Sequence, residues 1–152
     1  MTLRRIDHRV ATQAERALTT LAAGKPVPDE VLTRLKSLPV LLLKSGVATT
    51  LAYYAARSTD SDLGRAYRVV RAALIVELVD ELRWDPAPAA DGLYARLAAE
   101  PVADLSRAFA RLEAFADWFR KLAEGMQRDQ ERGAGKPPKP AAGEATGDGT
   151  DA

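Results

Sequence analysis

Several kinds of functional site are excluded by residues that this sequence lacks or has only once. The 152 residues contain no cysteine, which excludes disulfides, thiolate metal sites and cysteine nucleophiles. The single histidine, His8, cannot form a multi-histidine metal site and leaves little basis for a serine–histidine relay. Aromatic residues make up only 6% of the chain, which is too few for a β-rich core or for a sheet that stacks nucleic-acid bases.

Long apolar runs are also missing. The longest strongly apolar run, Leu38 to Leu43, ends at Lys44, far short of the ~20 residues that a membrane span requires. Residues 1–9 are polar and basic and are not followed by the apolar segment of a secretory signal. From these features we expect no membrane association and a cytoplasmic location.

Apolar residues recur at helical spacing along almost the whole chain, and no pair of strands is apparent. The pattern predicts helices over 3–22, from Pro28 to Leu38, and over 40–57, 62–83, 91–99 and 101–131. Pro39 is expected to separate the second helix from the third. The third is apolar on nearly all sides, which is typical of the buried centre of a bundle, and Gly46 in its middle predicts close approach of another helix. The predicted fold class is therefore all-α, a compact bundle of five to six helices.

The end of the chain differs in composition from the rest. Residues 133–152 contain five glycines and three prolines but no Leu, Ile, Val or aromatic residue. Such a segment cannot bury enough apolar surface to offset its ordering entropy. We therefore predict one helical domain over residues 1–132 and a disordered Gly/Pro-rich C-terminal tail over 133–152.

Motifs that carry catalytic chemistry are not found. The sequence has neither a G-x-G-x-x-G nor a Walker A motif. Two acidic clusters lie on predicted helices: Glu77, Asp80 and Glu81 form one, and Glu113 and Asp117 form the other. Their carboxylates could bind a magnesium ion, but such a pattern more often marks an acidic, solvated helix face. The sequence thus argues against an enzyme and predicts no cofactor, no metal site and no small-molecule substrate.

Charge is divided unevenly between the two halves of the chain. Residues 1–72 carry a net charge of +6, whereas residues 73–132 carry −4. This division suggests one surface that meets phosphate and another that meets a basic protein or a copy of the same chain. Two ordinary solvated surfaces are the alternative interpretation. Arginine outnumbers lysine 16 to 6, and its planar fork suits phosphate and interface contacts. The clustered cations are Lys44, Arg57, Arg65, Arg68, Arg71, Arg120 and Lys121.

Two segments resemble a known family. The segment LPVLLLKSGVATTLAYY, Leu38 to Tyr54, is similar to the L-P-x-hydrophobic … N-G-L … T-L-A-F segment of the small α-helical subunit of the type III-B CRISPR effector, the Cmr complex. The segment FADWFRKLA, Phe115 to Ala123, is similar to the hydrophobic-x-W-L-K-R-F-A ending of the same family. Ser45 stands where that family usually has asparagine.

The resemblance implies a non-catalytic subunit that stacks head to tail with copies of itself, beside the backbone subunits that hold the CRISPR RNA. It further implies contact with the large subunit and a place along the channel for target RNA, which the backbone subunits cut. Lys44 from the first segment, and Arg120 and Lys121 from the second, are then nucleic-acid or subunit contacts. Charge clustering alone, and not the resemblance, adds four arginines to this set of contacts: Arg57, Arg65, Arg68 and Arg71.

Two alternatives stay open at the level of sequence. The strip of Arg65, Arg68 and Arg71 suggests a stand-alone helical DNA-binding regulator, which requires a helix-turn-helix with a polar recognition helix. The acidic cluster around Glu77 suggests a magnesium-dependent hydrolase.

Overall fold

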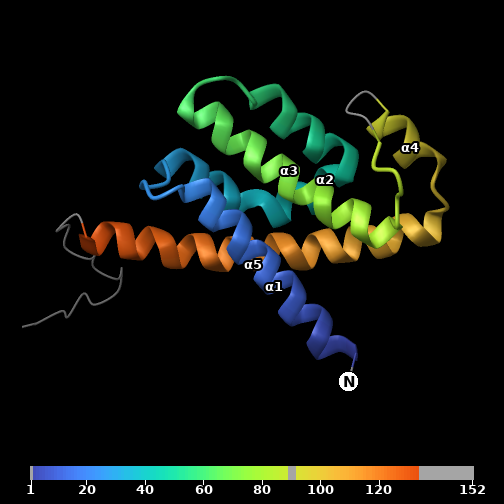
Figure 1. Cartoon of the computed structure of the whole chain (residues 1–152), viewed down its shortest axis with the longest axis horizontal. Helices are drawn as coiled ribbons and strands as arrows, with labels where there is room; N and C mark the ends of the chain where they lie inside the picture. Colours follow the sequence, from blue (N-terminus) through green and yellow to red (C-terminus); the bar gives the residue numbers. More distant parts are fainter. Residues whose placement is uncertain (1, 89–91, 134–152) are drawn as a thin grey trace, which may run out of the picture.

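The computed structural model describes residues 2–88 and 92–133, and in these two ranges every regular element is a helix (Figure 1). The helices are α1 (Thr2–Ala22), α2 (Asp29–Arg57), α3 (Asp62–Leu82), α4 (Leu93–Ala99) and α5 (Val102–Gly133). The predicted all-α class is confirmed. The predicted tail, apart from its first residue, lies outside the described residues.

The centre of the bundle is α5, because α1, α2 and α3 all pack against it (Figure 1). Apolar residues at spacings of three and four give α5 one continuous buried face. Its buried residues are Ala108, Leu112, Phe115, Ala116, Phe119 and Ala123. Each large side chain buried in this way contributes about 1.5–3 kcal/mol to stability.

The predicted break between the second and third helices is in the wrong place. The chain stays helical through Pro39 and bends sharply at Gly46, where φ is 79° and ψ is 176°. This backbone conformation is almost restricted to glycine, because a Cβ atom clashes with the backbone there. The two parts of α2 fold towards each other across the bend, since Arg34 of the first part and Tyr53 of the second line one cleft.

The expected reason for Gly46 is also wrong. A Cβ atom placed on Gly46 would meet no heavy atom within 4 Å, so no neighbouring helix requires a glycine at this position. The requirement comes from the backbone bend itself.

The expectation that residues 40–57 form the buried centre is likewise wrong. Only 28% of the most apolar stretch of α2 is buried, and the side chain of Leu43 is 67% exposed. α2 therefore lies at the surface and leaves apolar residues uncovered by the rest of the described chain.

By length and composition alone, α2 is the one described helix that is apolar enough to cross a membrane. The bend at Gly46 divides it, and neither part reaches the ~20 residues that a span needs.

Candidate nucleic-acid and subunit interface

The seven predicted contact residues differ in whether a carboxylate neutralises them. Four form ion pairs with acidic residues near them in sequence: Arg65 with Asp62, Arg68 with Asp60, Arg120 with Asp117 and Glu124, and Lys121 with Asp117. Within the described ranges, Lys44, Arg57 and Arg71 have no carboxylate partner. The guanidinium of Arg71 instead donates to the carbonyl oxygen of Leu51, at 3.3 Å, which joins α3 to α2. Among the seven, the charges of Lys44 and Arg57 are therefore the least neutralised by groups of the protein.

Lys44 lies in a cleft between the two parts of α2, together with Arg34, Tyr53 and Tyr54. At its edge the guanidinium carbon of Arg57 lies 3.7 Å from the centre of the Tyr53 ring, a cation–π contact. We call the set of Arg34, Lys44, Tyr53 and Arg57 the basic cleft. It joins residues that the sequence separates widely, because the bend at Gly46 brings the second part of α2 back towards the first.

The basic cleft stays positively charged at neutral pH. The nearby Tyr53 hydroxyl is the main cause that raises the pKa of Arg34 above its ordinary value. Burial raises the pKa of Tyr54, whose ring packs edge-on against Tyr53 at 5.6 Å between ring centres. The guanidinium therefore stays protonated and the buried phenol stays neutral, so Tyr54 adds no negative charge to the cleft.

Arg34 was missed by the sequence prediction. A signal for it was present, because Arg34, Leu41 and Lys44 follow one another at spacings of seven and three and so share a helix face. The contribution of Tyr53 and Arg57 to the same cleft was not visible, since it depends on the bend.

The remaining predicted cations lie elsewhere. Lys121 lines a separate cleft between α1 and α5, with Glu15 and Thr19, and its amino group lies 5.3 Å from the centre of the Trp118 ring. Arg65 and Arg68 lie in the first turns of α3, where the Ser61 hydroxyl accepts a hydrogen bond from the Gly64 amide at 3.0 Å.

The carboxylates of the acidic cluster around Glu77 form ion pairs with arginine side chains. Arg111 of α5 donates to Glu77 at 2.8 Å, to Asp80 at 2.6 Å and to Glu81 at 3.1 Å. Asp80 also accepts from Arg9 of α1 at 2.9 Å, so the network joins three helices. Burial raises the pKa of Glu77, and the Arg111 guanidinium opposes that shift. In the described part of the chain no group of three or more acidic, histidine or cysteine side chains is placed to hold a metal ion.

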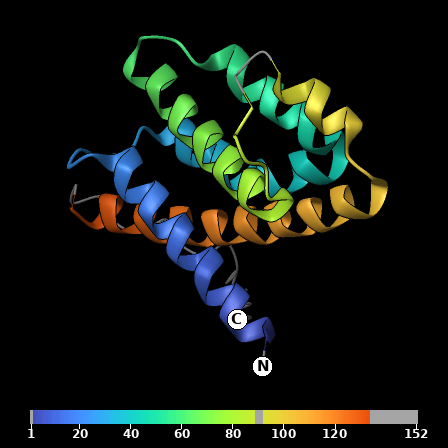
Figure 2. The same cartoon turned by 45° about the vertical axis from the view of Figure 1, so that its right-hand side comes forward.

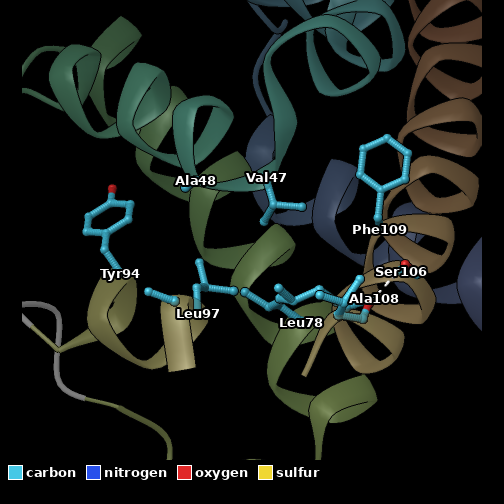
Figure 3. Close-up of a pocket in the computed structure, with 11 residues that line it drawn as sticks. Val47, Ala48, Leu78, Tyr94, Leu97, Ser106, Ala108 and Phe109 are labelled. Atoms are coloured by element: carbon cyan, nitrogen blue, oxygen red, sulfur yellow. Dashed lines mark hydrogen bonds between the residues drawn. The ribbon is translucent and has the colours of Figure 1, made fainter. Parts of the chain in front are cut away.

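An apolar groove of about 520 Å³ opens between α2, α3, α4 and the start of α5 (Figure 3). In Figure 3, Tyr94 and Leu97 come from α4, Phe109 comes from α5, and Val47 comes from α2 just after the bend. The side chain of Val102 at the groove is 80% exposed. The hydroxyl of Ser106, one of the few polar groups here, already donates to the Val102 carbonyl oxygen at 2.9 Å. An open apolar surface of this kind is typical of a surface that a partner covers.

Comparison with protein families gives one match, to the family described as CRISPR-associated protein (Cas_Cmr5), over residues 6–126. This range includes both segments that carry the resemblance and nearly all of the five helices. Searches of curated proteins and of solved structures gave no match.

Proposed function

The chain belongs to the CRISPR-associated Cmr5 family, and from this membership we propose that it is a non-catalytic structural subunit of a type III-B CRISPR effector, the Cmr complex. Membership implies association with other subunits of that complex. We further propose that the chain stacks beside the backbone subunits, touches the large subunit, and lines the channel for target RNA during antiviral defence in the cytoplasm. The family match over residues 6–126 is the observation that carries this proposal.

A structural role is supported by the use that the fold makes of its charged residues. The carboxylates that a magnesium-dependent hydrolase would need are engaged by Arg111 and Arg9. Several of the predicted contact cations are exposed on helix surfaces, which suits sequence-independent contacts in a complex where guide RNA supplies specificity by base pairing. All seven, Lys44, Arg57, Arg65, Arg68, Arg71, Arg120 and Lys121, remain proposed nucleic-acid or subunit contacts.

Stacking of copies is supported by the shape of the bundle. In both views the N-terminal end of α1 extends below α5, whereas α4 lies above α5 (Figure 1, Figure 2). Tyr94 and Leu97 of α4 line the groove. The sequence makes this end of α1 basic, and acidic residues such as Glu100 and Asp104 lie next to the groove residues in sequence. A protruding element and a groove on different sides of one chain allow a heterologous contact that repeats from copy to copy. We propose that the groove takes the N-terminal end of α1 of a second copy.

Co-expression with the other Cmr subunits tests the proposed function. The chain is expected to co-purify with a tagged backbone subunit and to remain in one peak with it on gel filtration. Failure to associate with all partners present would overturn the proposal.

Val102→Arg tests the groove. The side chain is exposed in the single chain, so the variant should fold normally, but a guanidinium at this position would be buried in an apolar contact and would repel the basic end of α1. We expect at least about a tenfold loss of self-association, measured by analytical ultracentrifugation, and fewer copies per assembled complex by native mass spectrometry.

Val76→Arg is the matched control, because Val76 is an exposed valine on α3 that does not line the groove. Equal self-association of the two variants and the unmodified chain would remove the groove from the stacking contact. Loss of the backbone subunit with unchanged self-association would assign the groove to that subunit instead.

A further inference from the structure

We propose that the basic cleft of α2 binds the phosphodiester backbone of single-stranded RNA, with Arg34, Lys44 and Arg57 as phosphate contacts and Tyr53 as the residue that positions Arg57. The choice of RNA as the nucleic acid rests on the proposed function. The site itself rests on the bend at Gly46, which places two cations from the first part of α2 beside an aromatic–cation pair from the second.

The cations of the cleft are available to a ligand. Within the described residues, none of Arg34, Lys44 and Arg57 has a carboxylate within ion-pair distance, in contrast to Arg65, Arg68, Arg120 and Lys121, which do. No acidic residue is among those that line the cleft. Glu30, one turn before Arg34, acts on this guanidinium from beyond ion-pair distance. A phosphate that enters therefore meets cations without a direct ion-pair partner and does not have to displace one.

Arg57 is held in a conformation suited to binding phosphate. Its guanidinium carbon lies 3.7 Å from the centre of the Tyr53 ring, and a guanidinium over a ring still presents N–H groups to an anion. Tyr53 in turn packs edge-on against Tyr54, which is buried. Because the side chain is already ordered, less conformational entropy is lost when phosphate binds.

The cleft has few groups that read bases apart from its cations, which are the proposed phosphate contacts. The side chains that line it include no Asn, Gln, Asp or Glu, which recognise adenine and cytosine edges. Arg57 also covers a face of Tyr53, so this ring face is not a free platform for stacking. The expected recognition is therefore independent of sequence, as suits a strand whose sequence is read by pairing with a guide.

The test measures binding of a fluorescein-labelled single-stranded oligouridine RNA to the isolated full chain by fluorescence anisotropy, at several salt concentrations. Combining Arg34→Ala, Lys44→Ala and Arg57→Ala is expected to weaken binding at least about tenfold and to reduce the salt slope by about 2, since each single-strand phosphate contact contributes about 0.7. The matched control combines Arg9→Ala, Arg96→Ala and Arg107→Ala, which removes the same charge from cations that other groups of the protein engage and that are not among the proposed contacts. The control should change the affinity by less than about threefold, and equal losses in the two triple variants would overturn the proposal.

Two further variants separate positioning from folding. Tyr53→Leu removes the ring under Arg57 and should weaken RNA binding, whereas Tyr53→Phe keeps the ring and should bind as the unmodified chain does. Equal binding by Tyr53→Leu would remove the positioning role. Competition by inorganic phosphate as effective as that by RNA, at equal phosphate concentration, would show a free-phosphate site and contradict backbone binding.

The same variants in the assembled complex separate this inference from the proposed function. If the cleft variant leaves the complex but retains RNA affinity, the cleft is a protein contact, and the inference fails while the proposed function stands. If the unmodified chain never joins the complex and the cleft variant still loses RNA affinity, the proposed function fails while the inference stands. Unchanged RNA binding by the cleft variant, both alone and in the complex, overturns the inference.

Discussion

Arg111→Ala is expected to lower the free energy of unfolding by about 3–5 kcal/mol, because it leaves Glu77 in the core without its cation. Glu77 is only 1% exposed, so water cannot replace the lost partner. Asp80 and Glu81 lose a partner at the same time, so three ion pairs between α3 and α5 are removed. In a chain of this size the melting temperature should fall by roughly 10–15 °C, measured by circular dichroism.

Two controls show whether the loss comes from the uncompensated charge. Arg107→Ala also removes ion pairs to acidic residues, but its side chain is 59% exposed, so the loss should stay below about 1 kcal/mol. Replacing both members of the buried pair, Glu77→Leu with Arg111→Met, should recover most of the stability, since no charge is then buried. A double variant as unstable as Arg111→Ala would show that packing volume, and not charge, determines the loss.

The same network predicts a pH dependence. Burial raises the pKa of Glu77 in the folded chain, so between the ordinary glutamate pKa and the raised value the folded state binds more protons than the unfolded state. The contribution of this group to stability therefore falls as pH increases through that window. Without Arg111, which lowers this pKa, the window extends upwards. The difference in unfolding free energy between Arg111→Ala and the unmodified chain should thus be smaller near pH 4 than at pH 7, and a constant difference would contradict this account.

The helices and the buried face of α5 could be predicted from the sequence because both follow from local spacing. Leu112, Phe115 and Phe119 recur at three and four residues, and the structure buries all three. The position of the bend in α2 could not be predicted in this way, because one apolar stretch contains two residues that can break a helix. Pro39 lacks an amide proton yet is tolerated in the helix, whereas Gly46 takes a conformation open to few other residues.

The candidate site was predictable in part. Lys44 and Arg57 stand out in the sequence, but their grouping with Arg34 requires the folded α2. The pairing of Arg120 and Lys121 with Asp117 was visible, since the residues are three and four apart on one helix. Opposite charges at these spacings identify cations that are already neutralised, which is a reason to rank unpaired cations above them as phosphate contacts.

The exposure of α2 has a different cause. An apolar pattern indicates that a surface will be covered, but it does not say whether the same chain or another subunit covers it. Val40 and Leu43 remain more than half exposed in the single chain. In a protein that belongs to a family of complex subunits, such residues are consistent with burial on assembly. Sequence spacing alone predicted that they are buried in the core of the single chain.

Gly46→Ala is expected to destabilise the chain by about 1–3 kcal/mol, because alanine at a φ of 79° and ψ of 176° strains the backbone. Free space around the position gives no relief, since the strain lies within the residue and not in a contact. Thermal unfolding measures the loss. Gly125→Ala is the matched control: Gly125 lies within α5 with open space around it, and its replacement should stabilise the chain by up to about 1 kcal/mol.

Pro39→Ala then distinguishes the two possible bends. If the turn of α2 depends on Gly46 alone, removing Pro39 restores a helical hydrogen-bond donor, leaves the fold unchanged and does not lower stability. The strained Gly46→Ala variant should also weaken RNA binding, because the bend brings Arg34 and Lys44 to the pair of Tyr53 and Arg57. Normal stability of Gly46→Ala together with loss of stability in Pro39→Ala would place the bend at the proline, and the basic cleft would then lose its structural basis.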